Sequence, residues 1–178
     1  MNDIRIMRPE VDGLIDLCNF VSEKTIVKYA LEVGSYIGES TITFAKKFKD
    51  LEYLYAVDPF NLEFNSDNLF NTSNIEIIKS TFIKNIKPYT TIKHIQENSK
   101  IACEMFDNEH FDFIYIDGCH EFSCVLEDAK LWKSKIKKGG CMSFHDIDWI
   151  DVQKALSVYF DLNEGYITKD NSITFRIN

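Results

Sequence analysis

The chain alternates between helical and extended hydrophobic patterns along most of its length. Apolar residues first recur at helical spacing over residues 10–23, which predicts an amphipathic helix there. Short apolar runs ending at polar or turn residues then predict five buried strands, at 29–33, 54–57, 91–95, 113–116 and 141–144. Helices are expected between and after them, at 40–48, 75–86, 101–106, 122–132 and 152–159.

Strands that alternate with helices indicate parallel βαβ units, and therefore an open α/β sheet with helices on both faces. The helix at 122–132 is expected to stop at Gly139–Gly140. Two short segments at 165–168 and 172–175 predict an antiparallel hairpin at the C-terminus. No repeat or linker interrupts the chain. We therefore expect one domain over 1–178, with an N-terminal helix (10–23), a cofactor-binding core (29–117) and a catalytic and substrate half (117–178).

A polar or glycine residue follows each of the five predicted strands: Gly34, Asp58, Asn98, Asp117 and Asp146. Ligands of open α/β sheets bind beyond the carboxyl ends of the strands, near the point where the strand order reverses. The pattern therefore predicts that these residues share one binding site.

The segment Glu32–Gly38 leads from the first predicted strand into a helix. Gly34 and Gly38 allow a tight turn and a close ligand approach, and the helix N-terminus can hold a carboxylate. Asp58, 20 residues beyond Gly38, is placed to bind the two hydroxyls of a ribose, although a helix cap is the alternative. A dinucleotide loop needs a glycine where Tyr36 stands. The loop therefore favours a nucleoside cofactor without phosphate.

Four motifs together give the chain a family resemblance: Leu31–Ser40 with its two glycines, Val57–Asp58–Pro59, Ile116–Asp117–Gly118–x–His120, and Lys138–Gly140 continuing to Phe144–His145–Asp146. Over residues 10–160 the chain resembles class I S-adenosylmethionine-dependent methyltransferases, and more narrowly a small bacterial-type group related to sugar and antibiotic O-methyltransferases. The resemblance implies a Rossmann-like, mostly parallel seven-stranded sheet with a C-terminal antiparallel hairpin.

The resemblance also implies roles for single residues in binding S-adenosylmethionine. Glu32, Gly34 and Ser35 are expected at the methionine end, with Tyr36 and Gly38 in the same loop. Asp58 is expected on the ribose. In the metal-free interpretation given below, Asp117 also holds the ammonium group of the cofactor. Asn98 and Ser99 match the segment that contacts adenine, although an Asn–Ser pair is also a common helix cap.

Asp117, His120, His145 and Asp146 are the candidates for the reaction itself. In one interpretation, His120 or His145 is the general base and Asp117 orients it. In the other, Asp117 and Asp146 bind a divalent metal, with His145 where metal-dependent relatives have an acid. Magnesium prefers oxygen ligands and manganese accepts imidazole. The sequence leaves both interpretations open, and it leaves open that His120 only caps the next helix.

Composition limits the partners and the location. A net charge of −8 argues against a nucleic-acid partner, and no apolar run is long enough to span a membrane. With no signal-peptide pattern and an odd number of cysteines, five, we expect a cytoplasmic protein with reduced thiols. Cys119 and Cys124 flank His120, but without a second CxxC or HxxxH pair they are interpreted as ordinary thiols. A homo-oligomer is left open.

The resemblance favours a small-molecule acceptor with a sugar-like hydroxyl. The loop at 60–74 and Trp149 are the candidates for an apolar lid, with Phe60, Phe64 and Phe70 as its aromatic residues. Two alternatives from other classes are a catalytically silent, partner-binding domain and a nicotinamide-dependent oxidoreductase. The second needs the glycine that Tyr36 replaces.

Overall fold

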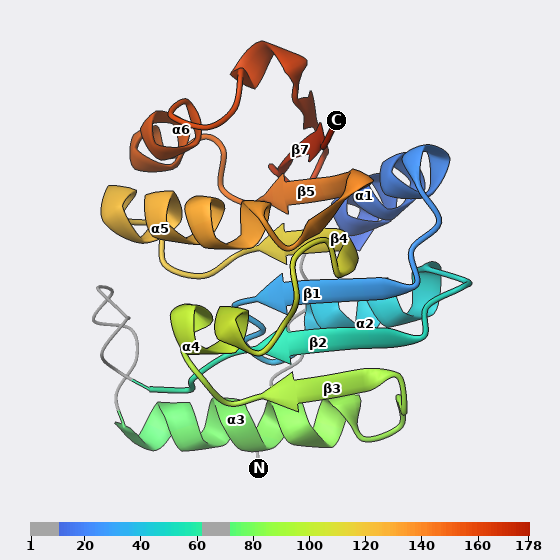
Figure 1. Ribbon diagram of the computed structural model, residues 1–178. Helices are drawn as coiled ribbons and strands as arrows, with labels where there is room; N and C mark the ends of the chain where they lie inside the picture. Colours follow the sequence, from blue (N-terminus) through green and yellow to red (C-terminus); the bar gives the residue numbers. More distant parts are fainter. Residues whose placement is uncertain (1–10, 62–71) are drawn as a thin grey trace.

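The protein is described by a computed structural model at residues 11–61 and 72–178 (Figure 1). Its centre is a seven-stranded sheet of order β3-β2-β1-β4-β5-β7-β6. The strands are β1 Tyr29–Val33, β2 Tyr53–Val57, β3 Ile92–Ile95, β4 Phe111–Ile116, β5 Ile136–Phe144, β6 Tyr166–Ile167 and β7 Ile173–Arg176. Strands β1 to β5 are parallel, and β7 is antiparallel to both β5 and β6. The predicted sheet and C-terminal hairpin are confirmed.

The helices are α1 Val11–Lys24, α2 Glu39–Lys47, α3 Thr72–Ile86, α4 Ser99–Glu104, α5 Phe122–Lys133 and α6 Ile150–Leu156, with a 3-10 turn at Leu162–Glu164. Side chains alternate across each strand, so the sheet supports two separate cores. Leu31 and Ile114 belong to the core with α4, α5 and α6. Ala30 and Phe113 belong to the core with α1, α2 and α3. Among the described residues, no helix has the length and apolar character needed to cross a membrane.

Strand β5 differs from the sequence prediction. Helix α5 ends at Lys133 rather than at Gly139–Gly140, and β5 begins at Ile136 instead of Cys141. Ile136 is buried and pairs with Phe111, whereas Phe113 pairs with Cys141, so β5 bulges between these two pairings. The bulge explains the glycine pair, because Gly139 takes φ +85°. The predicted helix stop was therefore a bulge within a strand.

The strand order reverses between β1 and β4, and there two loops come into contact. Figure 1 shows the arrowheads of β1 and β4 pointing the same way, so the residues that follow them lie at one edge. Gly34 follows β1 with φ +83°, and a Cβ on it would lie 2.0 Å from the Asp117 carbonyl oxygen. Only glycine therefore allows the loop after β1 to pass so close to the end of β4.

This contact predicts that Gly34→Ala destabilises the protein by about 2–4 kcal/mol, because it combines a strained φ with a backbone clash. Gly139→Ala is the matched control, since Gly139 has the same positive φ but nothing within 4 Å of its Cβ position. It should cost only about 1 kcal/mol. Urea unfolding of both variants measures the difference. Equal losses would show that backbone strain alone, and not the contact with Asp117, demands glycine at position 34.

Candidate functional site

A cavity of about 920 Å³ lies at the carboxyl ends of the parallel strands. Ten of the predicted site residues line it: Gly34, Ser35, Tyr36, Asp58, Asn98, Ser99, Asp117, His120, His145 and Asp146. Two others, Glu32 and Gly38, do not belong to its wall. The structure therefore brings most of the predicted residues to one place, although they come from five separate segments of the chain.

Asp58 holds the glycine loop in position. Its Oδ2 accepts hydrogen bonds from the backbone N–H groups of Ser35 and Tyr36, at 3.0 and 3.1 Å. Its Oδ1 accepts one from the N–H of Phe60 at 2.9 Å. Burial raises the pKa of Asp58, and these three amides oppose the shift. Since each carboxylate oxygen has two acceptor positions, the side chain keeps capacity toward the cavity that it lines.

Glu32 lies behind the loop and not on the cavity wall. It is fully buried, and its Oε2 accepts a hydrogen bond from the Thr41 hydroxyl on α2. Burial raises its pKa to about 7, and nearby hydroxyls, including those of Ser40 and Thr41, oppose the shift. Gly38, with φ +89°, starts α2 against the ring of Phe82. Both residues shape the loop in this structure, and their contact with a cofactor stays a prediction.

Asn98 and Ser99 lie at the start of α4, and Ser99 connects α4 to α5. Asn98 caps α4 by accepting a hydrogen bond from the N–H of Ile101 at 3.0 Å. The Ser99 hydroxyl donates to Asp128 and accepts from the Trp132 indole N–H at 2.7 Å. Asp128 is almost fully buried and also lines the cavity.

Sequence reasoning missed Asp128, although the helix pattern carries a signal for it. Asp128 follows Val125 by three positions and precedes Trp132 by four, so it lies on the apolar face of α5. A charged residue on such a face requires a partner. Tyr115 on β4 and Asp170 in the turn between β6 and β7 were missed as well, and both are buried residues that line the cavity.

Asp117, His120, His145 and Asp146 converge where β4 and β5 end. His120 Nε2 lies 2.7 Å from an Asp146 oxygen and 3.8 Å from an Asp117 oxygen. His145 Nδ1 lies 2.9 Å from the same Asp146 oxygen and 3.3 Å from the same Asp117 oxygen. Asp146 has φ +56°, which is uncommon for a non-glycine residue. Such local strain is typical of functional sites.

The charges in this cluster are strongly coupled. Asp117 and Asp146 raise the pKa of His120 to about 9. Burial lowers the pKa of His145, but the two carboxylates outweigh it and raise the value to about 11. Burial likewise raises the pKa of Asp146, but the two imidazoles outweigh it and hold the pKa well below its usual range. Two negative groups therefore keep positive charge beside them at neutral pH.

The predicted apolar lid is described only in part. Phe64 and Phe70 lie outside the described residues. Phe60 packs against the rings of Phe82 and His94. The Trp149 ring lies 5.0 Å from the His120 ring, and 48% of this residue is exposed. Trp149 is therefore an aromatic surface directly beside the cluster.

The model of a family described as a methyltransferase domain matches residues 31–147, which is more than half of the chain. The matched segment runs from β1 to just beyond β5 and contains every predicted site residue. The chain belongs to this methyltransferase domain family. The protein is therefore an S-adenosylmethionine-dependent methyltransferase, and its cofactor is S-adenosylmethionine. This decides against the nicotinamide-dependent oxidoreductase.

Solved structures similar to the methyltransferase share its fold at low sequence identity. A caffeoyl-CoA O-methyltransferase candidate from Staphylococcus aureus has a TM-score of 0.64 and 17% identity, covering 96% of this chain and 84% of its own. CalS11, a TDP-rhamnose 3′-O-methyltransferase of calicheamicin biosynthesis, has a TM-score of 0.65 and 12% identity, and the match covers 96% of this chain and 81% of CalS11. The N-methyltransferase NodS from Bradyrhizobium japonicum WM9 has a TM-score of 0.62 and 13% identity, and the match covers 99% of each chain. A comparison with curated proteins finds no match.

Asp128 predicts a pH dependence of stability in the methyltransferase. Burial raises its pKa to about 6, so between about pH 4 and 6 the unfolded chain loses this proton while the folded protein keeps it. Stability should therefore fall as the pH rises through that window, by on the order of 2 kcal/mol. Asp128→Asn should remove this contribution, because an amide does not ionise and its oxygen can still accept from Ser99.

Urea unfolding from pH 4 to 7 measures this dependence. The control is Glu127→Gln, which changes an exposed neighbouring carboxylate that pairs with Lys100. It should leave the pH profile almost as it is. A profile of Asp128→Asn that matches that of the unmodified protein would mean that Asp128 is ionised throughout.

Proposed function

We propose that the protein transfers a methyl group from S-adenosylmethionine to the hydroxyl of a small, sugar-like molecule, with a divalent metal held at the ends of β4 and β5. The observation that carries the proposal is the convergence of Asp117, His120, His145 and Asp146 on the wall of the cavity that the glycine loop and Asp58 also line. A cofactor position and a proton-handling position thus share one space.

The loop geometry supports a nucleoside cofactor. Tyr36 has φ +45° and lines the cavity where a dinucleotide loop would need a glycine. Asp58 retains one acceptor position for a ribose hydroxyl. Ser99 and Asp128 form a polar wall at the segment predicted to face adenine. The buried Glu32 positions the loop from behind.

The four-residue cluster fits a divalent cation. Donor atoms of Asp117, His120 and Asp146 all lie within 4.8 Å of one another. His120 Nε2 and His145 Nδ1 are buried and, despite the nearby carboxylates, lack a well-directed hydrogen bond. Two carboxylates with one or two imidazoles suit manganese better than magnesium. His120 is thus a candidate metal ligand, whereas the sequence interpretation of the metal site names Asp117, Asp146 and His145.

In the proposed reaction, the protein aligns the acceptor oxygen with the methyl carbon and removes its proton. The bound cofactor supplies a methyl group already activated on sulfur, and a bound cation would lower the pKa of the acceptor hydroxyl. Asp117, His120 and Asp146 would hold the cation. His145 is left to take the proton, because its pKa is high only while the two carboxylates are uncompensated. The oxygen–carbon bond forms as the sulfur–carbon bond breaks.

The acceptor proposal rests on the surroundings of this cluster. Trp149 offers an exposed aromatic face beside His120, a surface on which a sugar ring can pack. The net charge of −8 disfavours a nucleic-acid acceptor. CalS11, which is similar in fold, is described as acting on a nucleotide-linked rhamnose. A small-molecule acceptor is therefore the class to screen first.

We expect Asp58→Ala to weaken S-adenosylhomocysteine binding about 10- to 100-fold, because hydrogen bonds from hydroxyls to a charged carboxylate are lost. Isothermal titration measures the affinity, with NAD as the ligand that should not bind. An analogue lacking the ribose hydroxyls separates ribose contacts from loop support. This analogue should bind the unmodified protein weakly, and its affinity should fall little further in Asp58→Ala. Equal losses for both ligands would mean that Asp58 acts only through the loop.

Asp146→Asn should weaken manganese binding by more than about 10-fold, since it removes the carboxylate that both imidazoles approach. Paramagnetic manganese should quench Trp149 fluorescence, because that ring lies beside His120. Asp148→Asn, an exposed carboxylate that accepts from Asn171, is the matched control. Unchanged quenching in Asp146→Asn would contradict the metal proposal and leave the histidine-base mechanism. Cofactor binding without turnover on any hydroxyl acceptor would contradict the acceptor proposal.

A further inference from the structure

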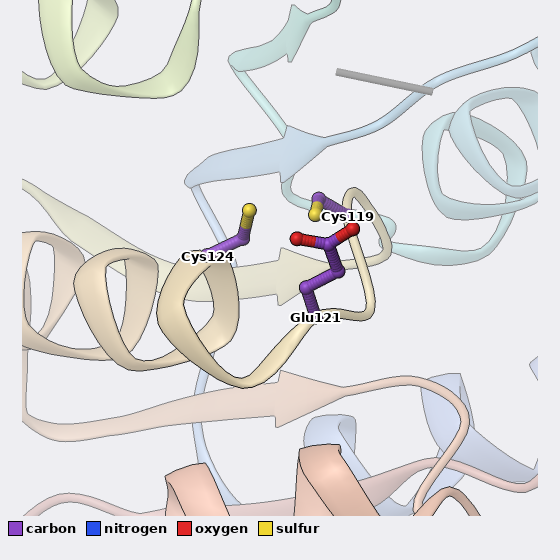
Figure 2. Close-up of side chains that lie close together, drawn as sticks. All are labelled: Cys119, Glu121 and Cys124. Atoms are coloured by element: carbon purple, nitrogen blue, oxygen red, sulfur yellow. The ribbon is translucent and has the colours of Figure 1, made fainter. Parts of the chain in front are cut away.

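Two cysteines and a glutamate gather beside the cofactor cavity, apart from the four-residue cluster (Figure 2). The Sγ atoms of Cys119 and Cys124 and a carboxylate oxygen of Glu121 all lie within 4.8 Å of one another. Cys119 and Glu121 come from the connection after β4, and Cys124 comes from the first turn of α5. Figure 2 shows the three side chains converging from these two segments.

The local chain geometry explains why His120 is not part of this group. His120 lies between Cys119 and Glu121 in the sequence, but its Nε2 approaches Asp146 at 2.7 Å. The short connection therefore presents imidazole to the oxygen-rich cluster and thiol plus carboxylate to the other side. The three residues are close in the sequence, but the structure separates the imidazole from the two thiols.

The position of Glu121 brings its carboxylate to the thiols. It occupies the N-cap position of α5, and its side chain makes no capping hydrogen bond. Glutamate is not among the residues that usually cap a helix, so the first turn of α5 does not hold this carboxylate. Here the carboxylate lies beside the two thiols instead (Figure 2). The three other cysteines of the chain, Cys18, Cys103 and Cys141, are buried, so only this pair is both close together and partly exposed.

We propose that Cys119, Glu121 and Cys124 form a binding site for a soft divalent cation of the zinc class. Tetrahedral zinc bonds thiolate sulfur at about 2.3 Å and carboxylate oxygen at about 2.0–2.2 Å, which places two sulfurs about 3.8 Å apart. The donor atoms, all within 4.8 Å of one another, therefore need to approach each other by only about 1 Å. The three protein ligands leave a fourth position, as in zinc sites that exchange a water or a ligand.

Without a metal, the surroundings of Cys124 favour the protonated thiol. Burial, and then the neighbouring Cys119 thiol, raise the pKa of Cys124 to about 12. Two thiolates side by side repel each other, but a bound dication attracts both and compensates their charge. A coordinating thiol is therefore deprotonated when the metal binds. Thiolate ligands select soft metals, whereas the carboxylate-rich cluster at Asp146 selects harder ones. The two sites therefore differ in the ion that each prefers.

The site also has a consequence for the cofactor, which rests on the proposed function. Cys119 and Cys124 line the same cavity as Ser99 and Asp128. A cation on these sulfurs occupies part of the wall that a nucleoside would face, so each ligand should weaken the other by the same factor. Zinc would thus act on this methyltransferase as an antagonist of its cofactor.

Cobalt titration of the reduced, cofactor-free protein tests the site itself. One equivalent should bind with a thiolate-to-cobalt charge-transfer absorption, and zinc should displace it. Cys124→Ser should weaken binding more than about 100-fold, because even loss of an outer partner costs 10- to 100-fold. Where cobalt still binds this variant, about half of the absorption or less should remain, because one of the two thiolates is lost. Glu121→Gln, at an exposed position that does not endanger folding, should weaken binding at least about 10-fold and keep the absorption.

Three control variants decide what an observed signal means. Cys103→Ala and Glu127→Gln change a thiol and a carboxylate outside the group and should leave the titration unchanged. Asp146→Asn should also retain the thiolate absorption. Cobalt binding without a thiolate band, or binding that Asp146→Asn removes, would overturn the proposal in favour of the four-residue cluster. These readouts need no cofactor, so they stand even where S-adenosylmethionine binding fails.

Discussion

Compensation of charge at the ends of β4 and β5 is the constraint around which the cavity is organised. Asp117 and Asp146 place two carboxylates within reach of two imidazoles, and neither acid can be left alone there without a large penalty. Protons on the histidines or a dication can satisfy them. The strained backbone of Asp146 and the pairing of β5 with β4 and β7 hold the carboxylate in place, whether protonated histidines or a dication balance its charge.

The sheet and much of the cavity wall were predictable because both depend on local patterns. Strand periodicity located β1 to β5, and the polar residue after each strand marked the carboxyl edge where parallel strands must meet. The C-terminal hairpin followed from two short segments around a polar turn. In these cases the determining interactions lie within a few residues in sequence, so one chain suffices to find them.

Other features depended on contacts between distant segments. The glycine pair in β5 resembles a helix stop until Ile136 is known to pair with Phe111. The place of Asp128 on the cavity wall and its bond to Ser99 depend on how α5 packs against α4, which the sequence does not show. Glu32 matches the family pattern, yet it faces α2 and not the cavity. From the sequence, Cys119 and Cys124 are interpreted as ordinary thiols, because the direction in which each side chain points after β4 cannot be derived from spacing.

The contact between Gly34 and the Asp117 carbonyl limits how such a protein can diversify. Because the two loops are in contact at backbone level, no side chain can be introduced at position 34 without moving the loop that follows β4. The two loops are therefore expected to change together or not at all. The surface around Trp149, which lies beside His120, and the turn at Asp170 on the cavity wall take no part in that contact, so they can vary without disturbing it.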